Sequence, residues 1–348
     1  MGRCERTMPE LAATAHQLVG SGKGVLAMDE SNGTCDKRFA AVGAAQTEEE
    51  RRAYRELIVT TPRLGESISG VILYDETIRQ RTKDGTLFVR VLTDAGIIPG
   101  IKVDTGAKPL AGHAGETITE GLDGLRARLR EYFQMGARFA KWRAVISLGD
   151  GLPSRGCIEA NAHALARYAA LCQEVGLVPI VEPEVLMAGE HSLERCQAVT
   201  EATLHSVFNQ LYAQDVLLDG IILKPNMVLP GLSCPRQQAV SEVAAATVTS
   251  LLRVVPAAVA GIAFLSGGQS SELASARLNA MNVIARSAGA RLPWPLAFSF
   301  ARAIQQPALE IWRGQQNHVV AAQQALAHRA LCNKAALKGE YSAAVERT

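Results

Sequence analysis

The sequence predicts an α/β fold, a single-domain (β/α)8 barrel with an extra N-terminal helix and a C-terminal helical segment. Eight short apolar runs, each bounded by glycine, proline or charge, occur at fairly even intervals along the 348 residues. Stretches with helical spacing lie between them, and this alternation is typical of a parallel sheet covered by helices. Eight such units in a chain of this length favour a closed barrel over an open, doubly wound sheet.

The elements can be placed in order along the chain. The expected strands are 24–28, 70–74, 97–103, 139–146, 178–185, 220–223, 261–265 and 295–300. A helix is expected at about 8–20, and apolar residues recur with helical spacing over 118–129, 158–172 and 240–251. Residues 308–337 look mainly helical, and the polar end KGEYSAAVERT has the composition of a mobile tail. No linker divides the chain, so we expect one domain over 1–348, with the barrel at about 22–306 and the C-terminal helix and tail at about 307–348.

Composition excludes several classes of function. The chain has 36 basic and 34 acidic residues, a balance that favours neither a nucleic-acid nor a membrane partner. Seven scattered cysteines without a CxxC pair indicate reduced thiols in a cytoplasmic protein, and no leader or membrane-spanning run is visible. None of the seven histidines lies at a strand end, so we expect no catalytic metal and no cofactor.

The segment DGIILKPNM (219–227) contains the most informative lysine. An apolar run ends in Lys224, and Pro225 follows at once, so the lysine should stand at the carboxyl end of a buried strand. Desolvation there lowers the pKa of an amine and frees it as a nucleophile. The alternative is an ordinary surface lysine at a strand exit.

Charged and polar residues gather at the carboxyl ends of the other strands, where a barrel carries its active site. They are Asp29 to Ser31, Asp75 and Glu76, Lys102 and Asp104, Lys141 and Arg143, Glu182 and Glu184, Ser266 to Gly268, and Ser299 with Arg302. Because strand side chains alternate, Lys141 and Arg143 share a face, and so do Glu182 and Glu184. A purely structural ion-pair network is the alternative interpretation.

These residue types divide the chemistry of an imine-forming enzyme between them. Lys224 is the candidate nucleophile, and Lys141 would lower its pKa further by like-charge repulsion. Glu182, flanked by lysines, is the candidate proton shuttle, with Asp29 and Glu184 as a second base and a charge partner.

Two groups of residues suit phosphates on either side of the amine. Ser266, Gly267 and Gly268 allow close backbone approach at a helix start, and the last strand delivers Arg302 nearby. Lys37, Arg38 and Lys102 form a second basic group, although Lys37 and Arg38 also fit an ordinary solvated helix start. Two anion sites around one amine indicate a bisphosphorylated carbonyl substrate.

The sequence resembles the class I fructose-1,6-bisphosphate aldolases. The matching segments are GKGVLAMDESNGT (22–34), GIKVDTG (100–106), FAKWRAV (139–145), PIVEPEVL (179–186), LLDGIILKPNMV (217–228), FLSGGQS (264–270) and FSFARA (298–303). The resemblance implies a TIM barrel, a metal-independent lyase of glycolysis and gluconeogenesis, and a homotetramer. It also implies reversible cleavage of fructose 1,6-bisphosphate to dihydroxyacetone phosphate and glyceraldehyde 3-phosphate.

The resemblance assigns roles position by position. Lys224 resembles the Schiff-base lysine, Glu182 the proton carrier of imine formation, and Asp29 the group acting at the carbon-4 hydroxyl. Lys141, Arg143 and Glu184 would arrange the charges. The residues that resemble substrate and phosphate contacts are Arg38, Ser266, Gly267, Gly268, Ser299 and Arg302, with Lys102 and Thr34 near the 6-phosphate.

Three positions depart from the family pattern. Asp219 stands where Glu is usual, and Ala301 stands where a glycine precedes the phosphate-binding arginine. Family members commonly end in a tyrosine that assists proton transfer, whereas Tyr341 is the last aromatic residue here. A modest rate on the bisphosphate is therefore expected. The alternatives are a Schiff-base aldolase preferring another sugar phosphate, such as fructose 1-phosphate, and a catalytically weak aldolase-like scaffold.

Overall fold

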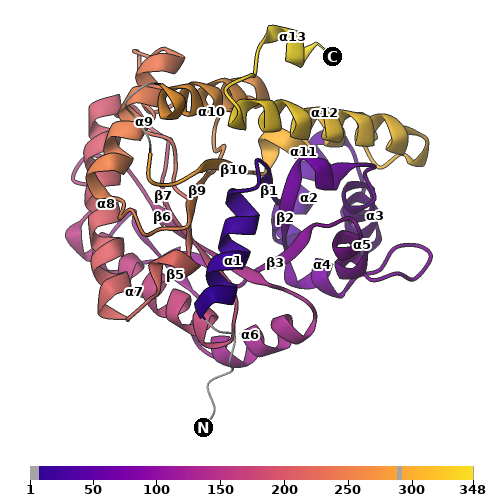
Figure 1. The fold of residues 1–348 in the computed structure, drawn as a ribbon, viewed down its shortest axis with the longest axis horizontal. Coiled ribbons are helices and arrows are strands. Elements are labelled where there is room, and N and C mark those ends of the chain that lie inside the picture. Colours follow the sequence, from indigo (N-terminus) through magenta and orange to yellow (C-terminus); the bar gives the residue numbers. More distant parts are fainter. Residues whose placement is uncertain (1–7, 288–291, 348) are drawn as a thin grey trace.

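The computed structural model describes residues 8–287 and 292–347, and within them eight parallel strands close into a barrel (Figure 1). The order around the barrel is β1-β10-β9-β8-β7-β6-β3-β2. The strands are β1 (Gly24–Ala27), β2 (Ile68–Leu73), β3 (Ile98–Lys102), β6 (Phe139–Ile146), β7 (Val178–Val185), β8 (Ile222–Leu223), β9 (Gly261–Phe264) and β10 (Leu296–Phe300). The predicted fold is confirmed, and every strand of the barrel lies close to its expected position.

Helices surround the barrel, as Figure 1 shows. They are α1 (Met8–Val19), α2 (Asn32–Val42), α3 (Glu48–Val59), α4 (Asp75–Arg79), α5 (Phe88–Asp94), α6 (Leu125–Gln134), α7 (Arg155–Glu174), α8 (Leu193–Ala213), α9 (Val240–Val254), α10 (Ser271–Arg286), α11 (Arg302–Trp312), α12 (Val319–Leu337) and α13 (Ala343–Glu346). The predicted extra helix is α1, which lies across the amino-terminal end of the barrel. There the hydroxyl of Ser69 lies 2.5 Å from the carbonyl oxygen of Leu18. The opposite, carboxyl end is left open for a site.

The predicted helix over 118–129 is wrong in its first half. Thr117–Glu120 is a strand, β5, which pairs antiparallel with β4 (Gly106–Pro109) in a hairpin outside the barrel. The hydroxyl of Thr119 donates to the carbonyl oxygen of Arg143 at 2.8 Å, which fastens this hairpin to β6. Gly121, with φ of 124°, then turns the chain before α6 begins. The helical spacing of apolar residues was accidental here, and β-branched threonines favoured the strand.

Glycines in the barrel make room for large aromatic side chains. A Cβ at Gly100 would lie 2.3 Å from the Cε2 of Phe139, and a Cβ at Gly24 would lie 2.5 Å from the ring of Phe298. Both aromatic side chains are fully buried. Such pairing of the smallest residue with a large one fills the barrel below its open carboxyl end, where the site lies.

We expect Gly100→Ala to lower the free energy of unfolding by about 1–3 kcal/mol, because the new methyl group overlaps the Phe139 ring. Gly33→Ala is the matched control, since a Cβ at Gly33 meets nothing within 4 Å. Urea denaturation of both variants measures the difference. An unchanged midpoint for Gly100→Ala would contradict the packing described here.

Candidate active site

The backbone around Lys224 fixes where its side chain emerges. Its N–H donates to the carbonyl oxygen of Val181 on β7 at 2.8 Å, which extends β8 by one more hydrogen bond. Pro225 has no N–H, so the pairing ends there. The buried side chain of Asn226 accepts a hydrogen bond from the N–H of Val185 at 3.0 Å and holds the departing chain against β7. Lys224 therefore stands at the carboxyl end of a strand, as predicted.

A cavity of about 570 Å³ opens at this end of the barrel. Nearly all of the predicted site residues line it, namely Asp29, Arg38, Lys102, Lys141, Arg143, Glu182, Glu184, Lys224, Ser266, Gly267, Ser299 and Arg302, together with Thr34. Its size lies in the range of ordinary small-molecule sites. Gly268 and Lys37, which the sequence also suggested, are not among the lining residues.

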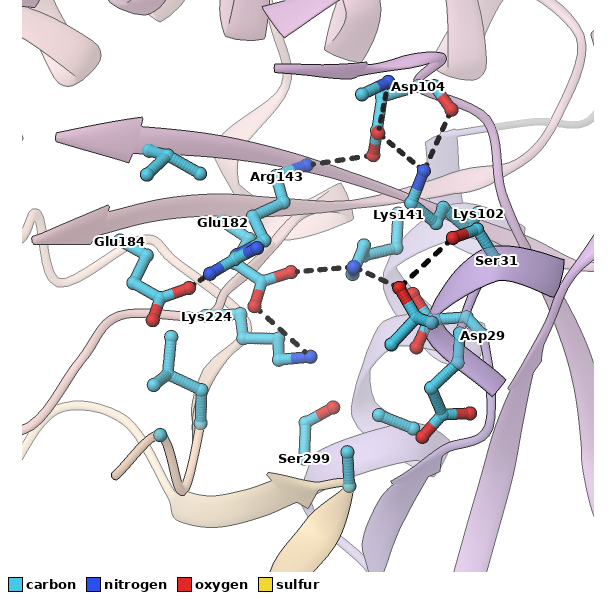
Figure 2. A pocket seen from close by; sticks show the side chains of 18 of the residues that line it. Asp29, Ser31, Lys102, Asp104, Lys141, Arg143, Glu182, Glu184, Lys224 and Ser299 are labelled. Atoms are coloured by element: carbon cyan, nitrogen blue, oxygen red, sulfur yellow. Dashed lines mark hydrogen bonds and ion pairs between the residues drawn. The ribbon is translucent and has the colours of Figure 1, made fainter. Parts of the chain in front are cut away.

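Two lysines and two carboxylates alternate in the centre of the cavity (Figure 2). The Nζ of Lys224 lies 3.4 Å from Oε1 of Glu182. The other carboxylate oxygen of Glu182 lies 3.1 Å from the Nζ of Lys141, which in turn lies 2.7 Å from Oδ2 of Asp29. All four residues are at most 7% exposed. Glu182 thus connects the two amines, and a proton can pass between it and either of them.

Burial and the neighbouring charges separate the pKa values of the two lysines. Desolvation, reinforced by the charge of Lys141, lowers the pKa of Lys224 despite the nearby carboxylates. Desolvation also opposes the charged form of Lys141, but Asp29 and Glu182 together outweigh it and raise the pKa of Lys141. Lys224 is therefore the amine that loses its proton more readily, and Lys141 remains a cation.

Asp29 stays ionised in this setting. Burial by itself would raise the pKa of its carboxyl group, yet the charges of Lys141 and Lys224 overcome that effect and lower the pKa. A carboxylate held in this form at the edge of the cavity can accept a proton from a substrate hydroxyl.

A second set of ion pairs surrounds the centre. Arg143 pairs with Glu184, and its backbone N–H donates to Oδ2 of Asp104 at 3.2 Å. Oδ1 of the same carboxylate lies 2.5 Å from the Nζ of Lys102. Glu184 is therefore a charge partner of Arg143. The ion pair with Asp104 offsets part of the positive charge that Lys102 brings to the cavity. The sequence showed Asp104 at a strand end but did not indicate this double role.

The sequence placed Glu30 at a strand end but indicated no role for it in the site. Its side chain is 6% exposed, forms ion pairs with Arg38 and Arg55, and accepts a hydrogen bond from Gln305 at 3.0 Å. Arg55 is 2% exposed, and its Nη1 lies 2.9 Å from Oε2 of Glu30. The two consecutive acidic residues after the first strand were the sequence feature that could have pointed to Glu30. Its partner Arg55 lies on α3, and only the fold brings that helix beside Glu30. Tyr74 lines the cavity as well.

The opposite wall of the cavity suits an anion. Ser266 and Gly267 follow β9, and Arg302 is the first residue of α11, whose N-cap residue Ala301 provides no side-chain hydrogen bond. An uncapped helix N-terminus leaves backbone N–H groups for an anion. From the sequence, the helix whose N-terminus faces the anion was expected to start directly after Ser266 to Gly268. That helix, α10, begins only at Ser271, and the side chain of Ser270 caps it. Figure 2 shows Ser299 on this wall, directed into the cavity.

Comparisons with known proteins agree on one family. A sequence model described as fructose-bisphosphate aldolase class-I matches residues 10–348. A probable fructose-bisphosphate aldolase class 1 of Xanthomonas campestris pv. campestris is 57% identical over 336 residues, 96% of this chain and 99% of that protein. The cytosolic fructose-bisphosphate aldolase 5 of Arabidopsis thaliana is 51% identical, over 96% of this chain and 92% of its own. A solved ternary complex of the Plasmodium falciparum fructose-bisphosphate aldolase with TRAP and a small-molecule inhibitor superposes with a TM-score of 0.93 at 45% identity, covering 96% and 95% of the two chains.

We expect Lys141→Met to move the pH dependence of imine formation at Lys224 to higher pH. The substitution removes a cation that lowers the pKa of Lys224 and leaves Glu182 and Asp29 to raise it. Since only the free amine attacks a carbonyl, the rise in rate with pH begins later. The measurement is the rate of borohydride-trapped adduct with a ketone phosphate across the pH range.

Lys37→Met is the matched control for charge removal, because Lys37 is exposed and does not line the cavity. Its profile should follow that of the unmodified chain. A Lys141→Met profile that is unshifted, or shifted to lower pH, would contradict the electrostatic coupling of the two lysines.

Proposed function

The chain belongs to the class I fructose-bisphosphate aldolase family, and we propose that Lys224 is the amine on which its reaction proceeds. The protein is a lyase that cleaves fructose 1,6-bisphosphate reversibly to dihydroxyacetone phosphate and glyceraldehyde 3-phosphate. The observation that supports the assignment is the buried series Lys224, Glu182, Lys141 and Asp29, with each contact at 3.4 Å or less.

In the first stage the free Nζ of Lys224 attacks carbon 2 of the open-chain sugar, and the carbonyl oxygen becomes the hydroxyl of a carbinolamine. Glu182, with Oε1 3.4 Å from this nitrogen, holds the proton it took when the amine was freed. After attack a second proton passes from the nitrogen to the carbonyl oxygen, and Glu182 then gives its own proton to the leaving hydroxyl. Water departs and an iminium remains. Lys141, held in its charged form, keeps the second oxygen of Glu182 oriented.

In the second stage the iminium accepts the electron pair of the bond between carbons 3 and 4. Asp29 takes the proton of the carbon-4 hydroxyl, and the aldehyde product leaves. The enamine on Lys224 is then protonated at carbon 3, and hydrolysis of the resulting iminium releases the ketone phosphate. A cationic Lys141 beside Asp29 stabilises the charge that moves during this stage.

The two phosphate groups of the substrate fit opposite walls of the cavity. The 1-phosphate fits Ser266, Gly267, Ser299 and Arg302 at the N-terminus of α11, and the 6-phosphate fits Arg38 with Lys102 and Thr34 across the cavity. Ala301 adds a methyl group at the first wall. Neither the family nor the named relatives favour fructose 1-phosphate or a scaffold role over the bisphosphate.

The assembly and the compartment are also proposals. The family resemblance supports a homotetramer, which sedimentation velocity can test. Two Arabidopsis thaliana relatives carry the word cytosolic in their names, which supports a cytoplasmic location. None of the helices within 8–287 and 292–347 is long and apolar enough to cross a membrane.

The proposal predicts that borohydride with dihydroxyacetone phosphate forms a covalent adduct on Lys224. Lys224→Met should form none, and Lys37→Met, which changes a lysine outside the cavity, should keep it as a matched control. Peptide mapping by mass spectrometry locates the modified lysine. An adduct on another lysine, or none on the folded unmodified chain, would overturn the assignment.

A companion prediction concerns Glu182→Gln. The amide keeps the shape of the side chain but cannot shuttle the proton, so kcat should fall by about 10²–10⁴-fold while KM for the bisphosphate changes little. Rapid-quench trapping should show that imine formation has slowed. A variant with undiminished imine formation would assign the proton transfer to another group.

A further inference from the structure

Three side chains with metal-binding atoms meet outside the lining of the cavity, where the tail returns along α12. His328 and Cys332 lie one helical turn apart on α12, and Glu346 ends α13. The Sγ of Cys332 lies 3.5 Å from Nε2 of His328, and the sulfur, nitrogen and carboxylate ligand atoms all lie within 4.8 Å of one another. We propose that these three residues bind a divalent transition metal ion of the zinc class.

The distances between the ligand atoms suit tetrahedral coordination. Zinc binds thiolate sulfur at about 2.3 Å and imidazole nitrogen at about 2.0–2.1 Å, so a tetrahedral angle places these two atoms about 3.6 Å apart. The separation of 3.5 Å between Sγ and Nε2 matches this value without any movement of α12. Only the Glu346 carboxylate must move closer, and it lies on a helix of four residues at the end of the chain.

The carboxylate is already oriented by other groups. The hydroxyl of Tyr341 donates to Oε2 of Glu346 at 2.6 Å, and Arg329 pairs with Oε1. Arg329 is a residue of α12, and its side chain is fixed by two hydrogen bonds to α10. It donates to the carbonyl oxygen of Ser271 at 2.9 Å and to the hydroxyl of Ser275 at 2.8 Å. Hydrogen bonds of this kind position metal-ligating carboxylates, and each oxygen retains a lone pair for the ion.

The identity of the ligands selects the ion. A thiolate, an imidazole and one carboxylate suit zinc and related ions, whereas magnesium and calcium prefer oxygen ligands alone. Zinc binds cysteine as the thiolate. The ion must therefore displace the thiol proton. Because binding releases the thiol proton, it should weaken as pH falls. His328 must also release its contact of 3.1 Å with the carbonyl oxygen of Glu346.

Such an ion would fasten the tail to the barrel. It joins α12 to α13, and Arg329 links the same group to the first turns of α10. None of the three ligands lines the catalytic cavity. We therefore expect the ion to raise thermal stability and to be dispensable for turnover, which separates this site from the chemistry at Lys224.

The test is titration of the chelator-treated full chain with Co²⁺ and Zn²⁺. We expect one equivalent bound per chain, a thiolate-to-cobalt charge-transfer band, and a higher Tm with Zn²⁺. Cys332→Ser should lose the band, His328→Gln should lower zinc affinity by more than about tenfold, and Tyr341→Phe should lower it by about 10–100-fold. Cys234→Ser, which changes a cysteine elsewhere, is the matched control and should bind as the unmodified chain does.

Two results would overturn the proposal. One is the absence of stoichiometric Co²⁺ binding by the folded chain. The other is a thiolate band that persists in Cys332→Ser and disappears in Cys234→Ser. Circular dichroism of each apo variant confirms folding before titration, and His328→Gln provides an independent reading should Cys332→Ser fail to fold.

Discussion

The carboxylate of Glu182, held between two buried lysines, is the interaction on which the site depends. An ion pair removed from water gives little net stability, because desolvation opposes the attraction between the charges. A series of two cations and two anions limits that cost, since each charge has at least one opposite neighbour within 3.4 Å. What the series provides is a difference between two amines, one kept charged and the other able to lose its proton.

The barrel makes this arrangement possible through strand alternation and register. Lys141 and Arg143 share one face of β6, and Glu182 and Glu184 share one face of β7. Arg143 lies directly opposite Glu182 in the register of these two strands, so Lys141 reaches Glu182 along the diagonal. Parallel strands present their carboxyl ends together, which brings Asp29 from β1 to the same place. Aromatic side chains packed against Gly24 and Gly100 fill the barrel below the site.

Much of this could be predicted from the sequence because it depends on local pattern. Apolar runs located the strands, and charge at their carboxyl ends located Lys224, Lys141 and Glu182. Contacts between distant segments carried no such signal. Arg55 reaches Glu30 only through the packing of α3, and the helix N-terminus at the anion wall belongs to α11 because Ser270 caps α10. The hairpin of β4 and β5 was hidden by an accidental helical period.

The C-terminal segment illustrates the same limit. Its composition predicted a mobile tail, and nothing in the order of residues indicated that Glu346 meets His328 and Cys332. The spacing of His328 and Cys332, one turn apart on a helix, was visible in the sequence, but two ligands do not define a site. Whether the tail moves remains a prediction, and its docked position on α12 is what brings the third ligand into reach.

An NMR titration of the ε-methylene groups of Lys224 and Lys141, assigned with the corresponding methionine variants, measures the difference between the two amines. We expect a pKa for Lys224 below the ordinary lysine value of about 10.4 and a pKa for Lys141 above it. A Lys224 that titrates at or above that value, with Lys141 below it, would contradict the proposed division of roles.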